Sequence, residues 1–228
     1  MKVIISHHQA EYLSRFAFPD AAFVFDDPAP EDFRGAGPRP FIVMEKAGSR
    51  SANRNAGLKY WLSLASDKNG IIEFFDGDRF PVQYEEPLAE MNKAQADILL
   101  YPCEKDIRLI YARPGDVLYM KGPGNPFFSC GFAIRMPAIH KIMEFNKGEF
   151  FSTAFSGWGG EDQYMGTVAA HLGLKCVLSA NTVLNGSVGG DEGEHPDYMQ
   201  AMTTYMQLVL KNGMKATLMD NVGPIRPE

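Results

Sequence analysis

Two carboxylates directly follow an apolar run in the first half of the chain. Asp76 and Asp78 flank Gly77 in "IIEFFDGDRF", and the run before them is typical of a buried strand. One interpretation is the Asp-Gly turn of a solvated hairpin, because Asp-Gly is a frequent turn dipeptide. The other is a hard-cation site, because a Mg²⁺ or Mn²⁺ ion bound by carboxylate oxygens can also take phosphate oxygens. Gly77 would then let a ligand approach the backbone closely.

A tryptophan and two acidic residues stand together in a second segment, "GWGGED" at 157–162. Glu161 and Asp162 suit the start of a helix, where acidic side chains meet the positive end of the helix dipole. The dipole does not account for Trp158 among three glycines. Its indole is either a plug in the core or a stacking platform for the apolar face of a sugar.

A third segment, "SRSANRNAG" at 49–57, joins a predicted strand to a predicted helix. Arg50 and Arg54 could reach phosphates there, assisted by the positive field of the helix N-terminus. The alternative is a capped helix start with solvated arginines. Among the histidines, His7 and His8 follow the first predicted strand, and His195 is either a metal ligand or an exposed loop residue.

Short apolar runs alternate with helical patterns along the chain. Extended segments are predicted at 2–6, 22–27, 41–46, 70–78, 106–113, 116–121, 126–136 and 175–185, and helices at 51–66, 87–98, 137–146, 161–173 and 197–213. This alternation predicts a single α/β domain over residues 1–228, with a mostly parallel central sheet flanked by helices. Ligands bind at the carboxyl ends of strands in such sheets, and Asp76 and Asp78 fall at such an end. The residues of the last helix expected to face inward are Met199, Met202, Met206, Val209 and Leu210.

Taken in this order, "RSANRNAG", "DGD" and "GWGGED" resemble the GT-A glycosyltransferases. The likeness is to the inverting galactosyltransferase and N-acetylgalactosaminyltransferase group, including the bacterial chondroitin-polymerase type, and it spans Lys2 to Leu184. The resemblance implies the nucleotide-diphospho-sugar transferase (GT-A) fold. It also implies transfer of a sugar from a nucleotide-diphosphate donor, a UDP-sugar, to the hydroxyl of a glycan or other acceptor, with inversion.

The resemblance also implies a role for each matching residue. Asp76 would contact the nucleotide ribose or the donor sugar, Asp78 would bind Mn²⁺ or Mg²⁺ bridging the diphosphate, and Asp162 would be the general base. The other donor-binding residues are Arg50, Arg54, Asn55 and Gly57, with Asn55 and Gly57 at the helix start. The residues of the acceptor or sugar pocket are Trp158, Gly159, Gly160 and Glu161. The metal ligands are Asp78, Asp76 and, as a candidate, His195.

Two features depart from the family pattern. The galactosyltransferases continue "GWGGED" with further acidic residues, whereas Gln163 and Tyr164 follow here. They also place a metal-binding histidine in a basic segment, whereas the residues before His195 are glycine-rich and acidic. The third metal ligand and the identity of the donor sugar therefore stay open.

Composition narrows the class of protein further. The 228 residues are 45% hydrophobic and 22% charged, which predicts a sizeable core. The net charge of −6 disfavours a broad nucleic-acid footprint. No apolar run reaches the roughly 18 residues of a membrane span. The N-terminus shows no secretory leader pattern and the three cysteines are scattered, so we expect a cytoplasmic location.

Three other functions are open on these patterns. A sugar nucleotidyltransferase also uses paired carboxylates on an α/β sheet, but it should carry a glycine-rich basic loop where this chain has "SHHQAEYLSRF". A non-catalytic module that binds a sugar nucleotide or a glycan would need the same pocket without turnover. Transfer to a modified nucleobase in DNA is the weakest alternative, because of the negative charge.

Overall fold

The structure is a computed structural model, and it describes residues 2–6, 15–16, 18, 21–25, 41–43, 49–64, 70–104, 117–118, 130–155, 159–186 and 198–214. Its strands are β1 (Lys2–Ser6), β2 (Ala21–Phe25), β3 (Phe41–Val43), β4 (Ile71–Asp76), β5 (Pro81–Gln83), β6 (Ile98–Leu100), β7 (Val117–Leu118), β8 (Gly131–Arg135), β9 (Cys176–Leu178) and β10 (Val183–Leu184). Its helices are α2 (Arg50–Leu64), α3 (Pro87–Ala94), α5 (Met136–Phe145), α6 (Glu161–His171) and α7 (Tyr198–Lys211).

Eight of these strands form the central sheet, in the order β3-β2-β1-β4-β8-β6-β9-β7. The run from β3 to β4 is parallel throughout, and β6 pairs with β9 in parallel. The pairs β4–β8, β8–β6 and β9–β7 are antiparallel, so the sheet is mixed. The predicted parallel sheet is thus found in its N-terminal half, and β4, which ends in Asp76, stands where the parallel part meets the antiparallel part.

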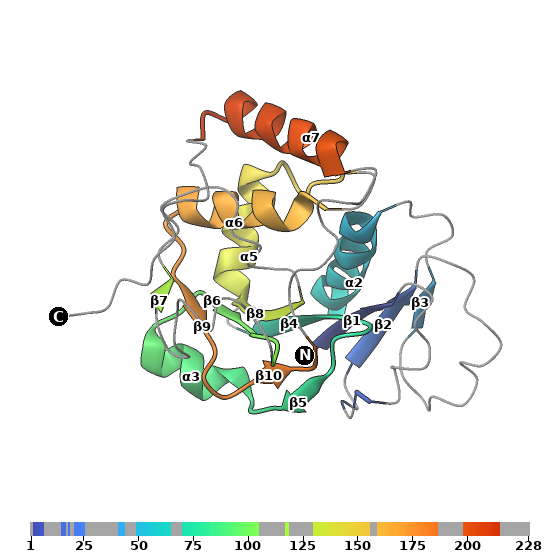
Figure 1. Cartoon of the computed structure of the whole chain (residues 1–228), viewed down its shortest axis with the longest axis vertical. Helices are drawn as coiled ribbons and strands as arrows, with labels where there is room; N and C mark the ends of the chain where they lie inside the picture. The colour runs from blue at the N-terminus through green and yellow to red at the C-terminus, as the bar shows by residue number, and fades with distance from the viewer. Residues whose placement is uncertain are drawn as a thin grey trace.

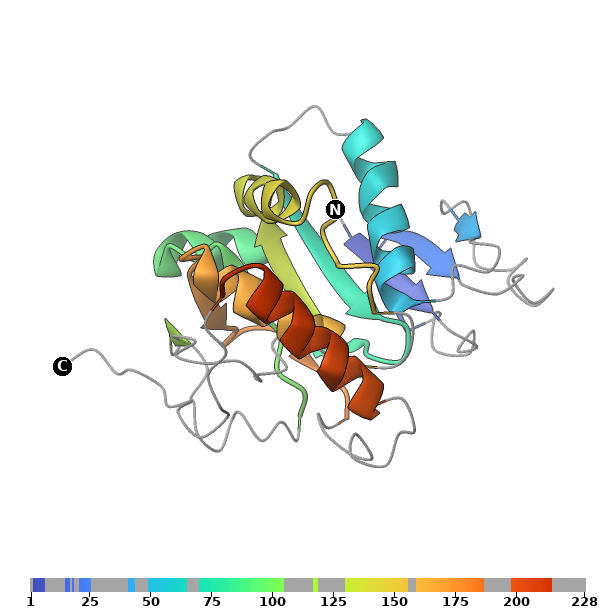
Figure 2. The same ribbon diagram turned by 90° about the horizontal axis from the view of Figure 1, so that it is seen from above.

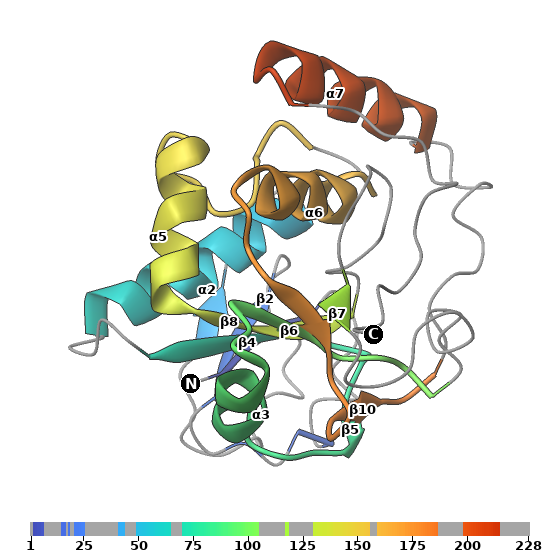
Figure 3. The same ribbon diagram turned by 90° about the vertical axis from the view of Figure 1, so that its left-hand side faces the viewer.

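Helices and a small second sheet cover the two faces of the central sheet. In Figure 1, α2, α5 and α6 lie on one face, and α3 with the pair β5–β10 lies on the other. Figure 2, from above, shows α7 crossing α6, and Figure 3 shows α7 as the outermost layer on that side. The architecture is therefore α/β, as predicted, with α7 as an additional layer above α6.

Each face of the sheet has its own hydrophobic core, because successive strand residues point to opposite faces. On β4, Ile72 and Phe74 join the core beneath α2, α5 and α6, whereas Phe75 joins the core on the α3 side. The first core holds stacked rings, with Phe74 lying 4.9 Å from Phe132 and 5.6 Å from Phe150 between ring centroids. By the same alternation Asp76 belongs to the face that carries α2 and α6.

Two element predictions are wrong in an informative way. The helix predicted over 87–98 ends at Ala94, because Gln95 adopts a left-handed conformation (φ 51°), and β6 then begins at Ile98. The extended run at 175–185 divides into β9, in the central sheet, and β10, which pairs with β5. In both places a tertiary pairing of β strands overrides a local pattern.

The inward face predicted for α7 is also wrong in part. Val209 is buried and Met202 is half-buried, but Met199, Met206 and Leu210 are 73%, 43% and 69% exposed. The residues that pack inward are Ala201, Tyr205 and Val209. Their spacing of four residues is typical of one face of a helix, and the three exposed apolar residues lie outside that face. None of the described helices is both long and apolar enough to cross a bilayer.

Candidate functional site

Asp76 stands at the end of a strand whose preceding residues are almost all buried. Its backbone N–H donates to the carbonyl of Cys130 at 3.0 Å, and its own carbonyl accepts from the N–H of Arg79 at 2.9 Å, which closes a turn. The strand after this turn, β5, pairs with β10 and belongs to a separate sheet. The segment is therefore a turn, but it does not form a hairpin between β4 and β5.

Asn185 fixes the backbone of this turn at its second acidic residue, Asp78. Its side-chain amide donates to the carbonyl of Asp78 at 3.0 Å, and its Oδ1 accepts from the N–H of Phe80 at 2.7 Å. The Asp78 carboxylate is 33% exposed, and its Oδ2 lies 3.8 Å from Nε of Arg79, beyond hydrogen-bond distance. The backbone of the turn is thus fixed while the Asp78 carboxylate stays accessible.

The second acidic pair begins α6 after a turn of two glycines. Gly159 and Gly160 both have positive φ, at 86° and 84°, a conformation that side chains rarely adopt. A Cβ on Gly160 would also lie 2.7 Å from the Phe155 ring and 3.2 Å from Cβ of Ala201 on α7. This turn delivers Glu161 and Asp162 to the positive end of α6.

Arg54 of α2 connects the strand end to the helix start. Its Nη2 donates to Oδ1 of Asp76 at 2.9 Å and its Nη1 donates to Oδ1 of Asp162 at 2.8 Å. Oε1 of Glu161 lies 3.8 Å from Nη1, and the guanidinium carbon stands 4.9 Å from the centre of the Phe151 ring. Three carboxylates from two elements therefore surround one guanidinium, whose side chain is only 2% exposed.

The neighbouring carboxylates keep Arg54 protonated. Burial alone would lower its pKa, but the carboxylates of Asp162, Asp76 and Glu161 raise the pKa above its usual value. Arg54 is therefore a permanent cation at the centre of the cluster. The two ion pairs leave the acids partly solvated, since Asp76 is 17% and Asp162 13% exposed.

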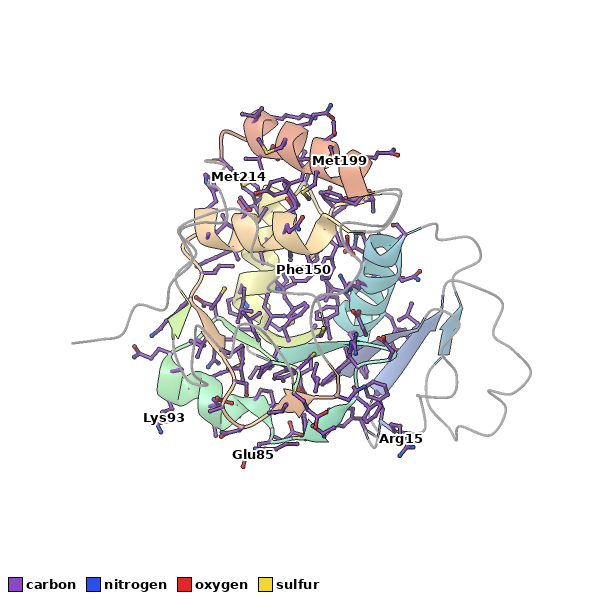
Figure 4. The ribbon with its side chains drawn as sticks, in the orientation of Figure 1. Arg15, Glu85, Lys93, Phe150, Met199 and Met214 are labelled. Atoms are coloured by element: carbon purple, nitrogen blue, oxygen red, sulfur yellow. The ribbon has the colours of Figure 1, made fainter. Side chains whose placement is uncertain are left out.

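The neighbouring residue on α2 ties the helix to the segment that leads into the glycine turn. Asn55 donates from Nδ2 to the carbonyl of Phe151 at 2.7 Å and accepts from the N–H of Phe151 at 2.9 Å. Both bonds are buried. The adjacent Phe150, labelled in Figure 4, lies between α6 and the sheet. The two hydrogen bonds from Asn55 therefore fix Phe151, on whose ring the Arg54 guanidinium lies.

The predicted site residues other than Asp78 thus separate into four groups. Arg54, Asp76, Glu161 and Asp162 meet in one cluster, with Gly159 and Gly160 in the turn beside it. Asn55 and Gly57 lie in α2 beyond its first turn, rather than at the helix start, and both are buried. Arg50 begins α2, although only its backbone is described. Residues His7, His8, Trp158 and His195 lie outside the described residues.

Two residues of this arrangement are missing from the sequence-based prediction. Phe151 supplies the surface on which Arg54 lies, and Asn185 fixes the turn at Asp78. Neither carries a charge or a motif that marks it in the sequence. The burial of Arg54 has a signal that could have revealed it: four predicted site residues are acidic, and acids brought together away from water require a cation.

Within the part of the chain that the structure describes, there is no group of three or more His, Cys, Asp or Glu side chains that could hold a metal ion. The accessible oxygen ligands are those of Asp78 and the partly exposed Asp76. A Mg²⁺ or Mn²⁺ ion bound by one or two carboxylates completes its shell with water and phosphate oxygens. The donor set of this turn fits that mode of binding.

The sequence matches no family model and no curated protein at a significant level. Solved structures are nevertheless similar. TarS of S. aureus, residues 1–349 in complex with UDP, superposes with a TM-score of 0.58 at 17% identity, covering 94% of this chain and 66% of that one. The complex of the same protein with UDP-GlcNAc gives a TM-score of 0.58 at 16% identity, covering 95% and 67%.

A third similar structure is the mannosyltransferase PcManGT from Pyrobaculum calidifontis in complex with GDP-Man and Mn²⁺. Its TM-score is 0.53 at 14% identity, covering 95% of this chain and 65% of that one. The present chain spans about two thirds of the length of these solved chains and 40% of the length of a longer TarS structure. At these identities the likeness establishes the fold, which is of the GT-A type.

Proposed function

We propose that this protein is a glycosyltransferase that moves a sugar from a nucleotide-diphosphate donor to an acceptor hydroxyl, with Asp162 as the general base. One observation carries the proposal: Arg54 joins the end of β4 to the start of α6, so that Asp76 and Asp162 flank one site. The GT-A type of fold supports the same class, since similar structures hold UDP-GlcNAc and GDP-Man. The order of the three motifs extends the proposal to the inverting galactosyltransferase-like group.

The general-base role suits the environment of Asp162. An acceptor hydroxyl becomes a good nucleophile only as its proton is removed, and a positioned carboxylate can accept that proton. Arg54 donates to Oδ1 of Asp162, so we propose that the proton of the acceptor hydroxyl goes to the other oxygen, Oδ2. Attack of the acceptor oxygen on the anomeric carbon, opposite the departing diphosphate, would invert that carbon.

Asp78 is the residue that we propose as the principal ligand of a Mn²⁺ or Mg²⁺ ion. Its carboxylate is accessible and only loosely paired with Arg79, whereas Oδ1 of Asp76 already accepts from Arg54. A bound divalent cation supplies positive charge to the diphosphate leaving group. Asp76 would contribute its second oxygen to the ion or to the donor. His195 stays a candidate for a further ligand.

The remaining donor and acceptor contacts are proposals carried by the motif resemblance. Arg50 begins α2, where backbone N–H groups and the helix dipole favour an anion such as the diphosphate. Gly159 is partly exposed beside the start of α6, whereas Gly160 is buried, and Trp158 directly precedes them. We propose that this turn forms the wall of the sugar pocket.

Ligand-induced thermal stabilisation tests the donor assignment. The protein is heated with UDP, UDP-GlcNAc, UDP-galactose, UDP-N-acetylgalactosamine or GDP-mannose, each with Mn²⁺ and with EDTA. A true donor raises the melting temperature, and raises it more with Mn²⁺, because only the folded state binds it. Release of the nucleoside diphosphate is then measured for the donor that stabilises best.

The outcomes separate the proposed activity from its alternatives. Release of UDP or GDP, with transfer of the sugar to water or to an added acceptor, supports the glycosyltransferase. Stabilisation without turnover, even in the presence of a broad panel of glycan acceptors, would favour a binding module. Formation of a sugar nucleotide from a sugar phosphate and UTP would identify a nucleotidyltransferase instead. No stabilisation by any of the nucleotides would overturn the proposal.

A further inference from the structure

Arg54 does not have the surroundings of an arginine that binds a phosphate. Both of its terminal nitrogens are already hydrogen-bonded to carboxylates, its side chain is 2% exposed, and one face lies over the Phe151 ring. To reach a diphosphate it would have to leave Asp76 and Asp162 and expose three carboxylates to one another. That rearrangement is costly, because breaking a buried ion pair leaves an uncompensated charge.

We propose that Arg54 is a positioning residue, which acts through Asp162 by holding the base in a fixed frame anchored to Asp76 at the end of β4. This inference rests on the proposed function and replaces the donor-binding role predicted for Arg54. Asp162 is 108 positions from Arg54 in the sequence and Asp76 is 22 positions away. Their relative placement therefore depends on the guanidinium that both of them bind.

The chemistry of the guanidinium explains why an arginine stands here. Its planar fork offers separate nitrogens, so Nη1 serves Asp162 while Nη2 serves Asp76. A lysine would bring one ammonium group and could not take up both positions in the same geometry. The frame itself is rigid, because the ring of Phe151 supports the guanidinium and Asn55, next to Arg54 on α2, is bonded twice to the backbone of Phe151.

The effect expected from such a residue differs from that of a donor ligand. Loss of a donor contact raises the KM for the donor, whereas displacement of the base lowers kcat. A misplacement of about 1 Å can cost roughly 100-fold in rate. Arg54→Lys should therefore lower kcat for nucleotide release by about 100-fold and change the donor KM by less than about threefold.

The experiment compares steady-state release of UDP or GDP, from the donor that stabilises the wild type best, in four proteins with Mn²⁺ present. These are the wild type, Arg54→Lys, Asp162→Asn and the double variant. If Arg54 acts through Asp162, adding Arg54→Lys to Asp162→Asn lowers kcat by less than about threefold more, so that the two effects are strongly non-additive. Arg135→Lys is the matched control, because Arg135 also donates two side-chain hydrogen bonds but at the far end of β8.

Several results would overturn the inference. A raised donor KM at unchanged kcat in Arg54→Lys would make Arg54 a donor ligand, and additive losses in the double variant would show that it acts independently of Asp162. If Arg54→Lys does not fold, Phe151→Leu serves as the second variant, because it keeps the arginine but removes the ring that supports it. Phe151→Leu should lower kcat and leave the donor KM unchanged. An unchanged kcat in this variant would overturn the inference. If the wild type is active, these results overturn only the positioning role of Arg54, and the proposed glycosyltransferase activity stands. If the wild type shows no turnover, both the proposed activity and the role of Arg54 are overturned.

Discussion

At the scale of single residues, the cluster around Arg54 combines two demands. A buried guanidinium needs carboxylate partners, and Asp76, Glu161 and Asp162 supply them. The same acids are the residues that the proposed transfer requires beside the donor and the acceptor. Such an ionic group contributes little net stability compared with an apolar core of equal volume, so its value lies in orientation.

Replacing Asp162 by asparagine tests the base most directly. Asparagine keeps a carbonyl oxygen that can accept from Nη1 of Arg54, so donor binding should persist, but it cannot take up the acceptor proton. We expect kcat to fall by about 10²- to 10⁴-fold, the usual contribution of a general base. Thermal stabilisation by donor and Mn²⁺ should stay within about twofold of wild type in apparent affinity. Near-normal turnover would remove Asp162 from this role.

Asp78→Ala separates metal binding from folding. The Asp78 carboxylate is a third exposed and makes only a loose contact with Arg79, so its loss should change the melting temperature of the free protein little. The additional stabilisation of the donor complex by Mn²⁺ over EDTA should disappear. Glu104→Ala, which removes another exposed carboxylate, should keep the Mn²⁺ effect. A Mn²⁺ effect of normal size in Asp78→Ala would place the metal elsewhere.

At the scale of elements, the start of α6 depends on two glycines that differ in their surroundings. Both have positive φ, but a Cβ on Gly159 would meet nothing within 4 Å, whereas a Cβ on Gly160 would press on Phe155 and Ala201. Gly160 therefore sets how closely α7 approaches the turn that carries Glu161 and Asp162. The glycine turn thus links the site to the outermost helix.

This difference predicts two unequal alanine substitutions. Gly159→Ala adds only backbone strain and should cost about 1 kcal/mol of unfolding free energy. Gly160→Ala adds the same strain and an overlap with a buried ring, so we expect a cost of about 3 kcal/mol. Urea denaturation of both variants measures the two losses. Equal losses would contradict the packing described around Gly160.

How much of these elements is predictable from the sequence depends on where the deciding contact lies. The strand before Asp76 and the helix after Gly160 are encoded by local patterns, and both are confirmed. The end of α3 is decided by the left-handed Gln95 and by the pairing of β6 with β8 and β9, which no local pattern contains. The burial of Arg54 is likewise decided by acids that are distant in sequence.

At the scale of the whole molecule, both cores bury groups that ionise at alkaline pH. Burial raises the pKa of the Cys176 thiol to about 12, and the carboxylate of Asp97 adds to the shift. Burial likewise raises the pKa of Tyr101, next to Glu73 on the other side of the sheet. The same direction holds for three further tyrosines, which are Tyr84, Tyr164 and Tyr205.

These shifts make the fold sensitive to alkali. An unfolded thiol loses its proton above about pH 8.5 and an unfolded tyrosine above about pH 10, whereas the folded protein keeps these protons. The unfolded state therefore binds fewer protons, and stability falls as pH rises. We expect the free energy of unfolding from urea titrations to be constant up to about pH 8.5 and then to decline towards pH 12.

Cys176 alone should contribute roughly 1.4 kcal/mol per pH unit to this decline between about pH 9 and 12. Cys176→Ala, though less stable at neutral pH, should show a correspondingly shallower decline, and an identical slope in the two proteins would show that Cys176 keeps no proton in the fold.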